Sequence, residues 1–253
     1  MIIGDNVTIK YNGREVVTDA SFKILDNRVT CIIGPNASGK TTLMRAIAGR
    51  VRYEGSILLD GVEVSTIPVK RLASLVTLVE GLGQRFAGVK VWDVLISARH
   101  AFTRGFFDTD EDVEAVRNAS GELGIQHLLD RDLWTLSSGE LQRVLLATAL
   151  VKESKYILLD EPDVHLDVRY KKELSRLLTT LKVKHTVVIS THDLVFASNV
   201  CEDIILLSMG RIVAKGSRRD MAGILLDNLE NVFGVKIGVS RHGEVDVLVP
   251  LYL

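Results

Sequence analysis

The chain has 253 residues, of which 47% are apolar and 25% are charged, a mixture typical of ordinary globular proteins. Acids and bases nearly cancel to a formal net charge of -1, so the charge balance gives no reason to expect binding to nucleic acid or to an anionic membrane. Because this length is near the upper end of what one hydrophobic core supports, we expect one large domain over residues 1–253.

The cysteines and the apolar runs bear on where the protein works. The two cysteines, Cys31 and Cys201, stand beside apolar runs and far apart, which predicts two buried thiols and favours a reducing compartment. Residues 1–10 lack the apolar core of a secretory signal, and no stretch approaches the about 18 uninterrupted apolar residues of a membrane helix. We therefore expect a protein that stays inside the cell and reaches any membrane from the water side.

The first sixty residues contain short strand patterns separated by Asn-Gly and Asp-Asn turns, and their alternation predicts a half-exposed sheet. These strands are expected at Asn6 to Lys10, Val16 to Ile24, Val29 to Ile33 and Gly55 to Asp60. Between Thr41 and Gly49 the apolar spacing becomes that of a helix. A strand therefore leads into a helix across a glycine-rich loop.

The middle of the chain has mostly helical patterns, which predict a helical lobe over residues 91–154. Its expected helices are Val91 to Arg99, Asp110 to Leu123 and Leu141 to Leu150.

After the lobe, two apolar runs flank a helical pattern from Val168 to Leu181, which predicts buried parallel strands at Tyr156 to Leu159 and Thr186 to Ser190. A hairpin around Gly210, an amphipathic helix and a last strand follow. The helix contains Leu225, Leu229, Val232 and Phe233, and the strand is expected at Val245 to Val249. We predict an α/β fold with a mainly parallel core sheet, formed by residues 1–90 and 155–253 together with an N-terminal antiparallel part.

A phosphate-loop motif lies between the predicted strand and helix. It is the pattern of glycine, four residues and glycine-lysine-threonine, and it consists of Gly34, Pro35, Asn36, Ala37, Ser38, Gly39, Lys40 and Thr41. Its backbone N–H groups and the helix N-terminus suit bound phosphates, and Lys40 would reach the β- and γ-phosphates of ATP. Thr41 would hold Mg²⁺ and Thr42 would reach the α-phosphate. A nucleotide site is the better reading than an accidental glycine-rich turn.

Two acids, Asp160 and Glu161, end the apolar run that starts at Tyr156. In a parallel sheet, that end lies beside the phosphate loop, because ligands gather outside the carboxyl ends of the strands. We expect Asp160 to hold Mg²⁺ and Glu161 to accept the proton of the attacking water.

A third motif opens the apolar helix that precedes the acidic strand, and it reads Leu136-Ser137-Ser138-Gly139-Glu140-Leu141-Gln142-Arg143. It resembles the signature of the ABC ATPase family, usually leucine-serine-glycine-glycine-glutamine. Val164 to Asp167 stands at the D-loop position and Ser190 to Asp193 at the switch-histidine position, in the family's order. The resemblance covers nearly the whole chain.

The resemblance implies a head-to-tail dimer with two ATP molecules at the interface, where the signature of each copy binds the γ-phosphate held by the other. Ser137, Ser138, Gly139 and Glu140 would take this role. Asp167 would also line the nucleotide, His192 would contact the γ-phosphate, and Tyr11 would stack on adenine. From the residues alone, Ser137 or Ser138 is equally an ordinary helix cap.

Three departures from the family pattern stand out. Ser138 replaces a glycine and Glu140 replaces a glutamine, changes that add bulk and negative charge beside the partner's phosphates. At the Q-loop the family carries a metal-binding glutamine, where this chain has Glu80 at the strand end and Gln84 four residues later. Spacing favours Glu80 as the metal ligand, whereas chemistry favours Gln84, and our hypothesis is that Glu80 binds the metal.

The segment from Val91 to Phe107 and the tail from Asn231 to Val235 resemble importers of iron-siderophore, haem and cobalamin. This resemblance implies membrane permease subunits as partners, an external substrate-binding protein, and a place on the cytoplasmic face of the membrane. An exporter subunit or an ABC ATPase without a membrane partner, such as an iron-sulfur assembly factor, remains an alternative. A DNA-repair ATPase is disfavoured, because the roughly hundred residues between phosphate loop and signature carry no sustained heptads.

Overall fold

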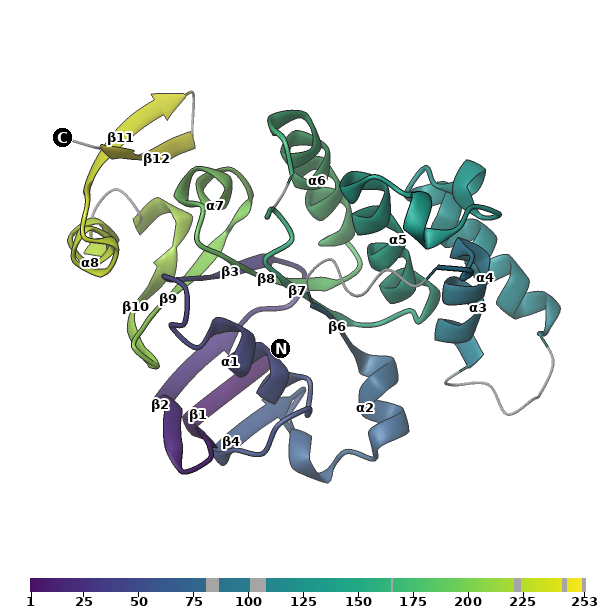
Figure 1. The fold of residues 1–253 in the computed structure, drawn as a ribbon. Coiled ribbons are helices and arrows are strands. Elements are labelled where there is room, and N and C mark those ends of the chain that lie inside the picture. Colours follow the sequence, from purple (N-terminus) through teal and green to yellow (C-terminus); the bar gives the residue numbers. More distant parts are fainter. Residues whose placement is uncertain (81–86, 101–107, 165, 221–223, 243–244, 252–253) are drawn as a thin grey trace.

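The computed structural model describes residues 1–80, 87–100, 108–164, 166–220, 224–242 and 245–251. Its centre is a six-stranded sheet of order β10-β9-β3-β8-β7-β6, in which only β10 runs antiparallel to its neighbour (Figure 1). The strands are β3 (Val29–Ile33), β6 (Val76–Glu80), β7 (Tyr156–Asp160), β8 (Thr186–Thr191), β9 (Asp203–Ser208) and β10 (Arg211–Ser217). The predicted parallel core is confirmed.

The central sheet divides the interior into two hydrophobic cores, because successive side chains of a strand point to opposite faces. In β7, Ile157 and Leu159 face one core, whereas Tyr156 and Leu158 face the other. Three helices cover the first face, α5 (Ser138–Val151), α6 (Val168–Leu181) and α7 (Leu194–Val200). Helix α1 (Lys40–Ile47) covers the second face. All five residues of β3 are buried, so a strand in the middle of this sheet needs a near-continuous apolar run rather than alternating polar and apolar residues.

The N-terminal strands form a separate antiparallel sheet of order β2-β1-β4-β5 that packs on α1 (Figure 1). Its strands are β1 (Ile2–Tyr11), β2 (Arg14–Ile24), β4 (Glu54–Leu59) and β5 (Val62–Glu63). One part of the prediction was wrong. The segment Val29–Ile33 was grouped with these half-exposed strands, but it crosses into the central sheet as β3, between β8 and β9.

Residues 91–154 contain the predicted helices, α3 (Val91–His100), α4 (Asp110–Glu122) and α5. The three helices pack on one another at one side of the central sheet (Figure 1). Arg99 of α3 joins them, since it pairs with the buried carboxylate of Asp112 and donates to the Val151 carbonyl oxygen at the end of α5. Short 3-10 turns at Gln126–Leu128 and Leu133–Thr135 lead to the signature segment.

The C-terminal region places α8 (Ile224–Phe233) and the two-stranded sheet of β11 (Lys236–His242) and β12 (Val245–Leu251) at the opposite side from the lobe (Figure 1). The sequence predicted α8 and β12 but not β11, α7 or α2 (Val69–Leu75). None of the helices in the described ranges has the length and hydrophobicity that a bilayer crossing needs.

The structure joins Cys31 and Cys201 in a disulfide, with Cα atoms 5.6 Å apart. Both residues are fully buried, as predicted, but the prediction of two separate thiols was wrong. Cys201 lies just before β9, and β9 pairs with β3 so that Ile204 stands opposite Cys31. Strand pairing therefore brings together two residues that are 170 positions apart, and the cysteines give no support for a reducing compartment.

Reduction of this disulfide should lower the free energy of unfolding by about 2–4 kcal/mol, because the bridge restricts the unfolded chain. Urea unfolding with and without dithiothreitol measures the difference. A double variant, Cys31→Ala with Cys201→Ala, is the control and should show no response to dithiothreitol. An unchanged unfolding midpoint of the unaltered protein in dithiothreitol would contradict the expectation.

Candidate active site

The phosphate loop, residues 34–41, connects the buried strand β3 to α1. Ala37 and Gly39 have φ angles of 62° and 105°, a left-handed backbone that occurs in anion-binding nests of N–H groups. A Cβ atom at Gly34 would lie 2.1 Å from the carbonyl oxygen of Leu207 in β9, so no side chain fits there. The loop therefore has the tight, glycine-dependent shape of a phosphate cradle.

Lys40 lies almost completely buried behind this loop, with 4% of its side chain exposed. Its Nζ donates to the carbonyl oxygens of Gly34 and Pro35 at 2.9 and 3.0 Å and lies 3.4 Å from Glu161 Oε1. The Ser38 hydroxyl is buried and has no hydrogen-bond partner among the described residues. A buried ammonium and an unsatisfied hydroxyl on a nest of N–H groups are donors that a phosphate engages, so these residues fit the triphosphate of ATP.

The acidic strand end meets the phosphate loop as predicted. Thr41 Oγ1 donates to Asp160 Oδ2 at 2.7 Å, and Ser190 Oγ donates to Asp160 Oδ1 at 2.5 Å. A carboxylate beside a hydroxyl offers the hard oxygen ligands that Mg²⁺ prefers. The donor set therefore fits a magnesium ion held between β7 and α1.

Glu161 lies between the two cationic or protonatable side chains that the sequence assigned to catalysis. Its Oε1 is 3.4 Å from Lys40 Nζ and 3.5 Å from His192 Nδ1. Glu161 and His192 are both partly exposed, so solvent reaches the space between them. Three residues from separate parts of the chain thus converge on one point beside Asp160.

Sequence reasoning missed Ser190 as a functional residue, although it quoted the run that contains it. The hydroxyl of Ser190 also accepts a hydrogen bond from the backbone N–H of Glu161 at 2.9 Å. One signal was available: Val188 and Ser190 are two residues apart in a buried strand, so both side chains face α1 and the phosphate loop.

The structure turns the Glu80 carboxylate towards two arginines that follow the phosphate loop. It accepts from Arg45 Nε of α1 and from Arg50 at 2.7 Å. The hydrogen bond that Arg45 donates to Glu80, and a weaker contribution of the Tyr11 hydroxyl, hold the pKa of the Arg45 guanidinium above its ordinary value. Metal binding by Glu80 stays a prediction that requires these ion pairs to open, and Gln84 lies outside the described residues. Tyr11 ends β1 and is 40% exposed, and its stacking on adenine stays a prediction.

The signature segment begins α5 through a capping box. The Ser137 hydroxyl accepts from the Glu140 N–H at 3.3 Å, and the Glu140 carboxylate accepts from the Ser137 N–H at 2.7 Å. These bonds, with the nearby charge of Arg131, lower the pKa of Glu140. The glutamate in place of the family's glutamine is therefore explained locally, since its charge is held by the helix cap and by Arg131.

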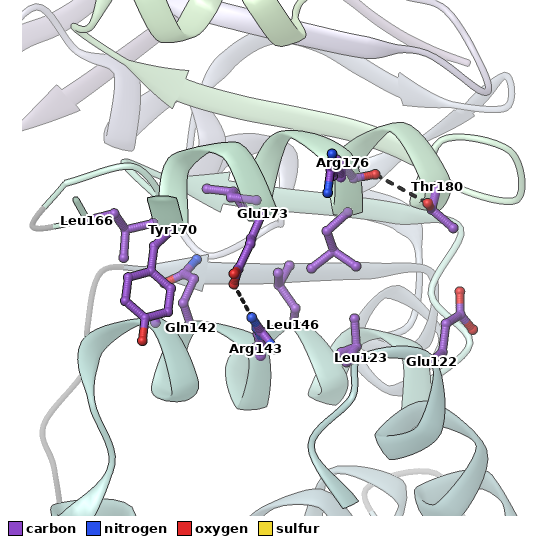
Figure 2. Close-up of a pocket in the computed structure, with 13 residues that line it drawn as sticks. Glu122, Leu123, Gln142, Arg143, Leu146, Leu166, Tyr170, Glu173, Arg176 and Thr180 are labelled. Carbon is purple, nitrogen blue, oxygen red and sulfur yellow. Dashed lines mark hydrogen bonds and ion pairs between the residues drawn. The ribbon is translucent and has the colours of Figure 1, made fainter. Parts of the chain in front are cut away.

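A neighbouring helix leaves no space for a side chain at Gly139. A Cβ atom there would lie 2.4 Å from Cδ1 of Tyr170, whose ring packs on the start of α5. Both residues line a groove of about 270 Å³ between α5 and α6, which the ion pair of Arg143 with Glu173 crosses (Figure 2). Tyr170 also donates its backbone N–H to Asp167, the N-cap of α6. The start of α5, which carries the signature, therefore packs against the first turn of α6.

Gly139→Ala should destabilise the protein by about 1–3 kcal/mol, because the added methyl group overlaps the Tyr170 ring. Thermal unfolding checks this. In a background carrying Tyr170→Ala the same substitution should cost clearly less, since the ring has been removed. Equal costs in the two backgrounds would show that the clash is not the cause.

The predicted site residues form two groups within one chain. The phosphate loop, Thr42, Asp160, Glu161 and His192 gather around α1 and the strand ends. The signature residues and Asp167 belong to α5 and α6, which cover the other face of the central sheet. Among the described residues no hydrogen bond or ion pair joins the second group to the phosphate loop.

Comparison with known proteins agrees with this geometry. The sequence profile of the ABC transporter family matches residues 17–164. The petrobactin import ATP-binding protein of Bacillus subtilis is 30% identical to the chain, over 93% of either protein.

Solved structures share the fold. A chain of a transporter that is described as metal-chelate type, in an inward-facing conformation, has a TM-score of 0.84 at 24% identity, covering 99% of this chain and 97% of the other. The dimeric bacterial ABC transporter cassette MJ0796 has a TM-score of 0.76 at 23% identity, covering 87% of this chain and 99% of the other. The chain therefore belongs to the ABC transporter family and is one of its ATP-binding subunits, which hydrolyse ATP to power transport.

Proposed function

We propose that this subunit drives the import of a metal chelate such as an iron-siderophore complex, haem or cobalamin, from the cytoplasmic face of the membrane. The observation that carries the hydrolytic part is the position of Glu161, whose carboxylate lies 3.4 Å from Lys40 and 3.5 Å from His192 beside Asp160. The kinship with a petrobactin importer subunit supports the direction and class of transport.

The residues divide the chemistry among them. Lys40 and the loop N–H groups bind the phosphates, while Thr41 and Asp160 would hold Mg²⁺, which would neutralise phosphate charge. Glu161 accepts one proton from the attacking water as the water oxygen bonds to the terminal phosphorus and the bond to ADP breaks. His192, which directly follows β8, contacts the terminal phosphate, so its position depends on whether that phosphate is bound.

A second copy of the chain completes each site. Cassettes of this fold form dimers, and the signature of one chain lies on the far face of the sheet from its own phosphate loop. Head-to-tail pairing would bring Ser137 and Gly139 of each copy to the nucleotide of the other. ATP then favours the closed dimer, and hydrolysis removes that preference, which supplies the mechanical step for the permease.

The cargo need not touch this subunit, because the permease and an external binding protein handle it. The test is therefore a reconstitution of the chain with its permease in proteoliposomes, with a binding protein on the outside. Import predicts that a binding protein loaded with a ferric siderophore, haem or cobalamin stimulates ATP hydrolysis and that the chelate accumulates inside. Export predicts the opposite movement without a binding protein, and an iron-sulfur assembly role predicts that no permease associates.

A further inference from the structure

Ser190 lies where β8 and β7 end side by side, and its hydroxyl contacts both acidic residues of the site. We propose that Ser190 is a positioning residue for hydrolysis, which orients the Asp160 carboxylate towards the metal and holds Glu161 in its catalytic backbone conformation. This inference rests on the proposed hydrolytic function of the site.

The first line of support is the strand register. Ser190 stands directly opposite Asp160 in the parallel pair of β7 and β8, so both side chains point to the face that α1 covers. Ser190 is fully buried, which keeps water from competing for its hydrogen bonds. Its hydroxyl donates to Asp160 Oδ1 at 2.5 Å and accepts from the Glu161 N–H at 2.9 Å.

The bond to Asp160 determines how that carboxylate is turned. Thr41 Oγ1 already donates to Oδ2 at 2.7 Å, and Ser190 donates to Oδ1. With one donor on each oxygen, the carboxylate plane has a single favoured rotation. Removal of the Ser190 hydroxyl leaves only the Thr41 contact, so Asp160 can turn away from the position in which it holds Mg²⁺.

The bond to Glu161 acts on the backbone. Glu161 has a φ angle of 49°, a left-handed conformation that costs a non-glycine residue free energy. The following residue, Pro162, adds to this strain because proline favours an extended conformation for the residue before it. A strained conformation persists where surrounding contacts determine it. The Ser190 hydroxyl supplies such a contact at the Glu161 N–H.

The test is Ser190→Ala, measured in two ways. ATP hydrolysis should fall about 10- to 100-fold in kcat, because the Asp160 carboxylate loses the hydrogen bond that Ser190 donates to it. Binding of a fluorescent ATP analogue should keep its affinity without Mg²⁺ and lose most of the increase that Mg²⁺ gives the unaltered protein. Ser190→Thr, which keeps the hydroxyl, should restore both.

The matched control is Ser198→Ala, which also removes a buried serine hydroxyl with two hydrogen bonds, to Leu194 and Leu248, but away from the site. It should leave kcat and the Mg²⁺ response unchanged. If Ser190→Ala does not fold, Ser190→Cys takes its place, because a thiol of similar size is a weak donor and should lower kcat in the same direction.

Glu161→Gln, assayed alongside, separates the two levels of the argument. If Glu161→Gln abolishes hydrolysis but Ser190→Ala keeps the kcat and Mg²⁺ response of the unaltered protein, the positioning role of Ser190 is wrong. If Ser190→Ala and Ser198→Ala lower kcat equally, the effect is structural and the inference also fails. If Glu161→Gln hydrolyses ATP normally, the proposed function of the site is itself wrong.

Discussion

Glu161→Gln should lower the rate of ATP hydrolysis by about 10²- to 10⁴-fold, the usual contribution of a general base. The amide keeps the size of the side chain but cannot accept the proton of the attacking water. ATP binding should persist, because the substitution leaves Lys40 and the phosphate loop in place, with Lys40 Nζ 3.4 Å from the altered side chain in the unaltered protein. The variant should therefore accumulate as an ATP-bound dimer, visible by size-exclusion chromatography in ATP and Mg²⁺.

The control for this experiment is Glu114→Gln, which neutralises an exposed acid on α4, far along the chain from the phosphate loop. It should hydrolyse ATP like the unaltered protein and form no trapped dimer. Full activity of Glu161→Gln would exclude Glu161 as the base. Loss of activity without dimer formation would agree with Glu161 as the base but would contradict the head-to-tail closed dimer.

Lys40→Ala should weaken ATP binding by about 10- to 100-fold, from the loss of charged hydrogen bonds to the phosphates. The substitution also removes the donor that now satisfies the carbonyl oxygens of Gly34 and Pro35, and it leaves Glu161 without its neighbouring cation. Titration with a fluorescent ATP analogue measures the affinity directly, and hydrolysis should be lost at ordinary ATP concentrations.

Lys172→Ala, at an exposed position of α6, is the matched control and should bind ATP normally. A thermal unfolding curve of each variant separates weaker binding from loss of the fold. If folded Lys40→Ala binds ATP as tightly as the unaltered protein, the phosphate loop is not the nucleotide site of this chain.

The sequence by itself determined most of the secondary structure and the main site. Helix α6 has the predicted bounds, Val168 to Leu181, because its apolar residues recur at helical spacing over its whole length. The phosphate loop and the acidic strand end were recognisable since their function depends on consecutive residues at a fixed spacing. Helix α7 escaped prediction because its seven residues carry too little helical periodicity, and β11 escaped because Gly238 and Ser240 within it are typical of turns.

Only the tertiary structure decided which distant residues meet. Strand pairing placed Cys31 beside Cys201 and Ser190 beside Asp160, and neither contact can be predicted from the neighbouring residues in the sequence. The packing of α1 beside β6 also directed the Glu80 carboxylate to Arg45 and Arg50, where spacing alone had suggested a metal. The physical reason is common to these cases: periodicity records which face of its own element a residue occupies, whereas strand order and register determine what that face touches.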